Sequence, residues 1–235
     1  MSENIQSERS SITENKDIVD MLNLEGASNR ASLTGLFEHE FQYSHMYKGK
    51  KFYKSKIAVI RKSGVRDVIP VIISQEVFDT IQYKVKGKYL QITGQINTHD
   101  VGMGTEKHRL SVFFCASKIS GKTCEGESNN TIFLRGKLCS KIYVKTKLTS
   151  GKKVLDFFIG VKKGYRKRDN IPCIAWYQVA DYIQENLKPG DEIELIGRIQ
   201  SRKYFKADNE ESDCENAKTT YEIAVSEVRL VSGNK

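Results

Sequence analysis

The sequence has no long hydrophobic run. Its longest predominantly apolar stretches, residues 58–60, 68–73 and 156–161, have the length of a strand, whereas a helix that spans a membrane needs roughly 20 apolar residues. The opening residues, MSENIQSERSSITENK, have neither an apolar centre nor a small-residue cleavage pattern. The sequence therefore predicts no membrane anchor and no secretory signal, and we expect the protein in the cytoplasm.

Motifs of metal binding and catalysis are also missing. The five cysteines form no CxxC pair and have no histidine at ligand spacing, and the four histidines are scattered. There is no P-loop, no GxSxG motif and no cysteine with a histidine partner. We therefore expect reduced structural thiols, no metal, no cofactor and no catalytic residues, so the protein is predicted not to be an enzyme.

Positive charge is what the sequence does have. Lys and Arg number 38 against 29 Asp and Glu, which gives a formal net charge of +9 and a pI near 9.2. This balance favours an anionic partner. A nucleic acid and a membrane surface both qualify, but no basic amphipathic helix supports the membrane.

A repeat about a hundred residues apart relates the two parts of the chain. Residues 29–35 (NRASLTG) match residues 130–136 (NTIFLRG), and residues 85–96 match residues 187–199, where a turn with Lys and Gly leads into a strand that ends in Gly-X-Ile. Two units of about 100 residues also fit the chain length. The predicted organisation is an N-terminal arm at 1–28, a first domain at 29–117, a linker at 118–129, a second domain at 130–231 and a tail at 232–235.

Strand-like segments dominate both units. In the second unit we expect five strands and a helix over residues 177–186, whose apolar side chains Val179, Tyr182, Ile183 and Leu187 recur at helical spacing. The strands are expected at residues 131–138, 153–162, 171–176, 191–201 and 220–230. Three strands, a helix and two strands is the order of an OB fold, a five-stranded Greek-key barrel. The first unit has the same order with a weaker helix at 75–83, so the predicted fold class is all-β, with two OB barrels in tandem.

Four segments of the second unit carry a family resemblance. They are NTIFLRGKL (130–138), DFFIGVKKGYRKRDN (156–170), IPCIAWYQVADYIQENLKPGDEIELIGRIQSRKY (171–204) and YEIAVSEVRLV (221–231). In this order and spacing they resemble the bacterial single-stranded DNA-binding protein family. The first unit is similar in outline only. The resemblance implies a tandem OB-fold variant of that family in the bacterial cytosol or nucleoid.

In that family the bases stack on a few aromatic side chains, and the resemblance assigns this role to Tyr165, Trp176 and Tyr204. Aromatic side chains flanked by cations also suit binding without sequence preference, because every base has a π face and every nucleotide a phosphate. The predicted nucleic-acid-binding residues are Tyr165, Trp176, Tyr204, Phe205, Lys162, Lys163, Arg166, Lys167, Arg168, Arg198, Arg202, Lys203, Lys145 and Lys147. Two structural alternatives stay open, a core position for Trp176 and a merely solvated hairpin tip at 162–168.

Some features do not follow the family pattern. Asn170 stands where members often carry a further aromatic, and the chain ends in VSGNK without the acidic, Phe-terminated tail of cellular members. An acidic loop at residues 207–217 would repel a phosphate chain beside it. In the first unit, residues 37–53 mix aromatics with lysines, and these aromatics either pack in cross-strand pairs or contact DNA.

The favoured function is that of a single-stranded DNA-binding protein that coats or protects DNA during replication, recombination or repair. By analogy with family members that pack four OB barrels, we expect a homodimer. Replication or recombination proteins are further candidate partners. The alternatives are an OB-fold protein-interaction module, such as a primosome or mobile-element accessory factor, and an RNA-binding protein.

Overall fold

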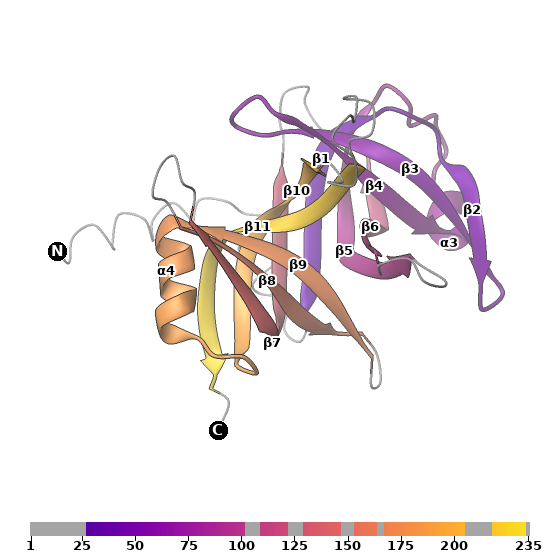
Figure 1. Ribbon diagram of the computed structural model, residues 1–235. Coiled ribbons are helices and arrows are strands. Elements are labelled where there is room, and N and C mark those ends of the chain that lie inside the picture. Colours follow the sequence, from indigo (N-terminus) through magenta and orange to yellow (C-terminus); the bar gives the residue numbers. More distant parts are fainter. Residues whose placement is uncertain are drawn as a thin grey trace, which may run out of the picture.

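The structure is a computed structural model that describes residues 27–101, 109–121, 129–146, 153–163, 167–204 and 218–233. Strands dominate the molecule (Figure 1), which confirms the all-β fold class. The N-terminal half contains β1 (Asn29–Phe37), β2 (Gln42–Tyr47), β3 (Lys50–Ile60), β4 (Arg66–Ser74), α3 (Gln75–Asp79), β5 (Tyr89–Val101) and β6 (Arg109–Ser120). The C-terminal half contains β7 (Asn130–Thr146), β8 (Lys153–Lys162), β9 (Arg168–Trp176), α4 (Tyr177–Asn186), β10 (Glu192–Tyr204) and β11 (Lys218–Ser232).

Strand pairing closes on itself in each half. In the C-terminal half the pairing runs from β7 through β8, β9, β11 and β10 back to β7, and in the N-terminal half from β1 through β3, β4, β6 and β5 back to β1. One pair in each circuit is parallel, β9 with β11 and β4 with β6, and the others are antiparallel. With a helix before the fourth strand, both circuits follow the OB order. The domain boundaries stay a prediction, although β6 runs three residues past residue 117.

The prediction of helix bounds is correct for α4 and only partly correct for α3. Helix α4 has the predicted bounds, and it buries Ala180 and Ile183. Tyr182, predicted on the buried side, is 39% exposed, because the side of α4 that packs on the barrel passes through Ala180 instead. The helix predicted at 75–83 extends beyond the C-terminal end of the observed helix. Helix α3 stops at Asp79, and the chain then turns so that Val85 enters the core.

The repeated asparagines and glycines perform the same structural task in both halves. The Asn29 side chain donates to the Ile96 carbonyl (2.6 Å) and accepts from the Ile96 amide (3.0 Å). Asn130 does the same with Ile199, at 2.8 and 2.9 Å. A Cβ on Gly35 or Gly136 would lie 2.2 or 2.5 Å from a carbonyl oxygen of the neighbouring strand. The repeat therefore marks the residues that close each barrel.

Strands β1 and β7 join the two halves. They pair antiparallel, with Ala31 opposite Ile132 and with Asn29 opposite Leu134. Since β1 and β7 are related by the sequence repeat and pair antiparallel, a local pseudo-twofold axis between them relates the two halves. Figure 1 shows the halves side by side. Buried apolar residues from both halves form one continuous core. Burying each large side chain there contributes roughly 1.5–3 kcal/mol, so the seam is part of the folded unit.

A second contact between the halves is polar. The buried Asp67 carboxylate of β4 accepts from Arg61 (2.6 and 2.7 Å) and from the backbone amide (2.8 Å) and hydroxyl (2.7 Å) of Ser201 in β10. Arg61 also donates to the Ser201 carbonyl at 3.0 Å. Burial raises the pKa of Asp67, but the hydrogen bonds outweigh it and hold the pKa below its usual value. This carboxylate is therefore charged and tied to both halves.

Candidate nucleic-acid interface

The outer side of the β8–β9 hairpin gathers several of the predicted binding residues. Along both strands alternate residues point into the core, which leaves the even-numbered side chains facing outward. The outward cross-strand pairs are Val154 with Trp176, Asp156 with Ile174, Phe158 with Pro172, Gly160 with Asn170 and Lys162 with Arg168. This row, which we call the β8–β9 face, spans about 26 Å at roughly 3.3 Å per residue. It has an aromatic end and a cationic end.

Trp176 forms the aromatic end. It is partly buried and packs on Val154, Ile174 and Ala224, a small apolar cluster outside the main core. Trp176 therefore lies outside the main core and is partly buried against this smaller cluster. Its neighbour Tyr177 is half exposed, with the two ring centroids 6.5 Å apart.

The turn after Trp176 has an uncommon backbone. Tyr177 has a φ of +52°, in the left-handed region that residues with a side chain rarely adopt. Such a conformation costs on the order of 1–2 kcal/mol. Here it directs the chain sharply from β9 into α4 and places two aromatic side chains side by side at the end of the outward row.

Four lysines and arginines form the cationic end. Lys162 stands opposite Arg168, and the backbone amide of Lys163 donates to the carbonyl of Lys167 at 2.8 Å. The Lys163 ammonium forms an ion pair with Asp169, with 2.8 Å between Nζ and Oδ2. Within the described part of the chain, Lys162, Lys167 and Arg168 have no carboxylate within 4.0 Å. Among the described residues, no carboxylate competes with a phosphate chain for these three cations.

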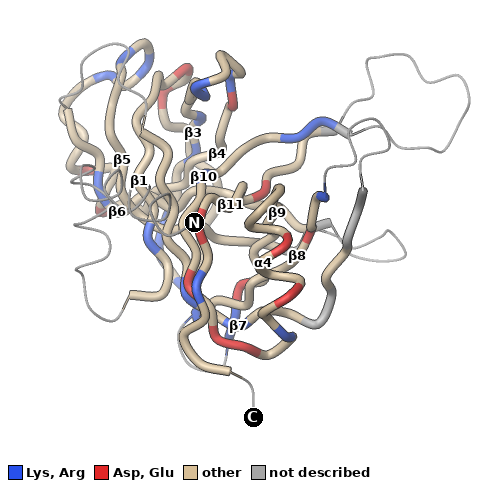
Figure 2. The backbone as a smooth tube through the Cα atoms, turned by 90° about the vertical axis from the view of Figure 1, so that its left-hand side faces the viewer, with Lys and Arg blue, Asp and Glu red and all other residues tan. Residues whose placement is uncertain are grey.

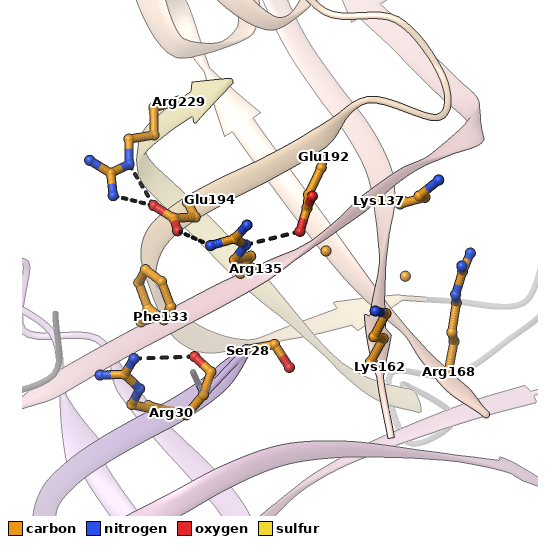
Figure 3. A pocket seen from close by; sticks show the side chains of 13 residues that line it. Ser28, Arg30, Phe133, Arg135, Lys137, Lys162, Arg168, Glu192, Glu194 and Arg229 are labelled. Carbon is orange, nitrogen blue, oxygen red and sulfur yellow. Dashed lines mark hydrogen bonds and ion pairs between the residues drawn. The ribbon is translucent and has the colours of Figure 1, made fainter. Parts of the chain in front are cut away.

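A pocket of about 630 Å³ continues this cationic surface around the barrel (Figure 3). Lys137, Lys162 and Arg168 line one side of it. On the other side Arg135 pairs with Glu192 at 2.9 Å, and Glu194 lies between Arg135 and Arg229. The hydrogen bond from Arg135 lowers the pKa of Glu192 and raises that of the guanidinium. Since both carboxylates are neutralised by these arginines, the pocket keeps a surplus of positive charge.

Two further predicted cations, Arg198 and Arg202, lie on β10, on the far side of β11 from β9. Arg198 is the cross-strand neighbour of Ala224, which belongs to the apolar cluster under Trp176. Burial lowers the pKa of the Arg198 guanidinium, and the nearby Arg61 lowers it further. Arg202 forms an ion pair with Glu222, with 3.5 Å between Nε and Oε2. Figure 2 marks the positions of Lys and Arg along the backbone in blue, and both halves of the chain carry them.

The remaining predicted residues are placed only in part. Lys203 is exposed on β10. Lys145 and Tyr204 belong to β7 and β10, opposite Val154 and Lys218, but their side chains are not described. Four predicted binding residues lie outside the described residues: Tyr165, Phe205, Arg166 and Lys147. The acidic loop 207–217 and most of the N-terminal arm lie outside them as well.

Two aromatic residues of this surface were missed by the sequence reasoning. Tyr143 is 51% exposed on β7, opposite Asp156, and Tyr177 is 50% exposed. Tyr143 stands between Lys141 and Lys145 with one residue on each side. This is the same pattern of aromatic and cation that identified the other candidates, so the signal was present in the sequence.

One thiol lies beside the β8–β9 face, since Cys139 Sγ is 3.8 Å from Asn170 Oδ1. Cys115, Cys139 and Cys173 are free, and burial raises the pKa of each thiol, most strongly for Cys173. Among the described residues, no three His, Cys, Asp or Glu side chains gather as metal ligands would. No helix described here is long and apolar enough to cross a membrane.

Comparison with known proteins identifies the C-terminal half. Residues 129–231 match the Single-strand binding protein family. The wild-type single-stranded DNA binding protein from Thermus aquaticus superposes with a TM-score of 0.68 at 16% identity, covering 88% of this chain and 94% of that one. A deletion mutant of it gives the same TM-score and identity, with 88% and 96% covered. The N-terminal domain of PriB protein from Thermoanaerobacter tencongensis is 26% identical over 42% of this chain and 100% of that one, with a TM-score of 0.34. No curated protein matches the sequence.

Proposed function

We propose that the protein, whose residues 129–231 match the Single-strand binding protein family, binds single-stranded DNA on its β8–β9 face without sequence preference. The observation that carries this proposal is the position of Trp176. It packs on Val154, Ile174 and Ala224 outside the main core. Arg198 stands opposite Ala224, and Lys162 and Arg168 form the other end of the same row.

The chemistry needed for such binding is simple. A base that stacks on the accessible part of the Trp176 ring makes a π contact, which contributes on the order of 1–3 kcal/mol per base. The phosphates then follow Lys162, Lys167 and Arg168 in one direction and Arg198 in the other. None of these groups reads the edge of a base, so affinity depends on length and salt more than on sequence.

We propose that Tyr165 and Tyr204 supply two further stacking surfaces. Phe205 and Arg166 are their sequence neighbours, Lys147 follows β7, and all three would extend the contact with bases and phosphates. This assignment rests on the family resemblance of segments 156–170 and 171–204. Replacing Tyr165 and Tyr204 together by Ala should weaken binding without unfolding the chain, and unchanged affinity would remove both residues from the site.

We further propose that the protein acts as a homodimer that coats single-stranded DNA in replication, recombination or repair. Two copies of a chain with two OB barrels present four, the number that members of this family assemble. Light scattering should give twice the monomer mass of 26.8 kDa. A monomer at micromolar concentration would contradict the dimer and leave DNA binding itself untouched.

The experiment that tests the function is a fluorescence-anisotropy titration of labelled oligo-dT at two salt concentrations, with oligo-rU as a second ligand. For a single strand, log K falls with log salt by about 0.7 for each phosphate contacted, so the four cations named above predict a slope near −3. Stronger binding of oligo-rU would reassign the surface to RNA. An absence of binding at low salt would overturn the proposal and favour a protein-interaction module.

A further inference from the structure

The N-terminal half lacks an aromatic residue at the position of Trp176. Strand registers relate the two halves, since Ile57 pairs with Ile69 as Ile159 pairs with Ile171. Counting along the same strands, the pair Phe52 and Ser74 corresponds to the pair Val154 and Trp176. Ser74 serves another purpose, because its hydroxyl accepts from the Val77 amide at 3.4 Å and caps α3. An aromatic surface at this place must come from elsewhere.

Strand β2 brings aromatic side chains to this place. Its counterpart in the C-terminal half is the end of β7, where Lys145 stands opposite Val154 as His45 stands opposite Phe52. Strand β2 forms a hairpin with β3 through a turn at Lys48 and Gly49, both at positive φ. A bulge at Ser44 turns the later residues of β2 over, so that His45 lies opposite Phe52 and Tyr47 opposite Lys50. The His45 and Phe52 rings are stacked, with centroids 5.1 Å apart and planes 8° from parallel. Phe52 thus lies on β3, the strand next to that of Ser74, and His45 lies on β2, one strand further out.

This stack is open on one side. Strand β2 is the last strand in the order of the sheet, so no further strand covers the His45 ring on the side away from Phe52. His45 is exposed, and Tyr47, two residues along on the same side of β2, is 55% exposed. An imidazole, like a phenyl ring, is a surface on which nucleic-acid bases stack. A base placed on His45 would continue the stack that Phe52 begins.

The surroundings of the stack are basic. Lys54 and Lys56 point to the same side of β3 as Phe52, and no carboxylate lies within 4.0 Å of either in the described part of the chain. Lys50 is paired with Glu76 at 2.7 Å, and the ammonium of Lys48 lies 5.5 Å from the centre of the Tyr47 ring. The charge on this side therefore complements a phosphate chain.

We propose that His45, Phe52 and Tyr47 form a second stacking platform that holds bases of the single-stranded DNA, with Lys54 and Lys56 on its phosphates. The proposal rests on the proposed function, because it gives a ligand of the same class to the N-terminal half. One strand of DNA that reaches both platforms has to be longer than one that occupies Trp176 alone. The second platform therefore contributes only to the binding of long oligonucleotides.

The hairpin offers a matched control on its other side. Tyr43 is also 55% exposed, but it precedes the bulge and pairs with Tyr53, whose ring is stacked on Phe78 of α3 at 4.0 Å. Tyr43 and Tyr47 have the same chemistry, exposure and strand. They differ in the face of the hairpin that they occupy.

The test compares His45→Ala/Tyr47→Ala with Tyr43→Ala in anisotropy titrations with dT8 and dT40. The double variant should bind dT8 like the wild type and dT40 about tenfold more weakly, in line with the loss of one or two stacked bases, and Tyr43→Ala should match the wild type with both. Equal dT40 affinity in the double variant and the wild type would overturn the platform and leave the proposed function standing. Failure of the wild type to bind either oligonucleotide would instead overturn the proposed function.

A cross-linking experiment on the wild-type protein tests the platform without relying on variants that have to fold. Photolysis of the complex with an iododeoxyuridine oligonucleotide should attach DNA to the tryptic peptide 31–48, at His45 or Tyr47. Attachment at Tyr43, or no attachment to this peptide while peptides of the C-terminal half are labelled, would contradict the platform.

Discussion

At the end of the third strand of its barrel the C-terminal half has Trp176, and at the same position the N-terminal half has Ser74, which caps a helix. The closing contacts are nevertheless the same in both, since Asn29 holds Ile96 as Asn130 holds Ile199. These closing asparagines bond both a backbone N–H and a C=O, and few other side chains can do so. The outward positions are free to differ, so two barrels with one scaffold can present aromatic surfaces on different strands.

The largest expected effect concerns the link between the halves. Replacing Asp67 by Ala leaves Arg61 and the Ser201 amide without their common partner, and removing one member of a buried ion pair costs about 3–5 kcal/mol. Denaturant unfolding should show that loss in the free energy of unfolding. Asp79→Ala, which removes an exposed carboxylate of α3, should change the same quantity by less than about 0.5 kcal/mol. An equal change in both variants would contradict the role of the link.

The same link predicts a pH dependence. The pKa of Asp67 is lower in the folded chain than in the unfolded chain, where it lies at about 3.9. Its stabilisation is therefore complete above that value and is lost as the pH falls through the lower, folded pKa. The difference in unfolding free energy between the wild type and Asp67→Asn should stay constant from pH 7 to about pH 5 and shrink below about pH 4. A difference that grows on acidification would have the wrong sign.

The difference between Trp176 and Ser74 predicts that substitutions at the two positions affect DNA affinity differently. Trp176→Ala should weaken oligo-dT binding about 10- to 100-fold through the loss of stacking. Ser74→Ala should leave DNA affinity within a factor of two and lower the free energy of unfolding by about 1 kcal/mol through the loss of the helix cap. Anisotropy with labelled DNA measures the first and denaturant unfolding the second. Equal DNA affinities for the two variants would remove the distinction between the halves.

The shared scaffold predicts equal effects of two repeat-related substitutions. Asn29→Ala and Asn130→Ala each leave a backbone N–H and C=O of a neighbouring strand without a partner, which costs about 1–3 kcal/mol. Two unfolding curves, one for each variant, test this equality. A loss confined to one variant would show that the second asparagine does not close its barrel.

The smallest effect is expected from single cations on the β8–β9 face. Lys162→Gln and Arg168→Gln should each reduce the slope of log K against log salt by about 0.7. Lys188→Gln, an exposed lysine in the turn that follows α4, serves as the control and should leave the slope unchanged. A slope that does not change in the first two variants would remove these residues from the phosphate path.

Much of the C-terminal half was predictable because its signals are local. The bounds of α4 follow from helical spacing and a Pro-Gly stop, and the order of strands and helix gives the OB topology. The hairpin of β2 was harder, because a bulge at Ser44 changes which residues share a face and leaves no mark in an alternating pattern. The link from Asp67 to Ser201 joins residues 134 positions apart, and no periodicity reports such a contact.

The central claim is that a base stacks on Trp176, and the intrinsic fluorescence of the protein tests it most directly because this is the single tryptophan of the chain. Saturating oligo-dT should quench the emission strongly at low salt, and added salt should restore it along the same curve that anisotropy gives for dissociation. Unchanged tryptophan emission in a complex that anisotropy shows to be formed would contradict the account, since the DNA would then lie elsewhere on the molecule.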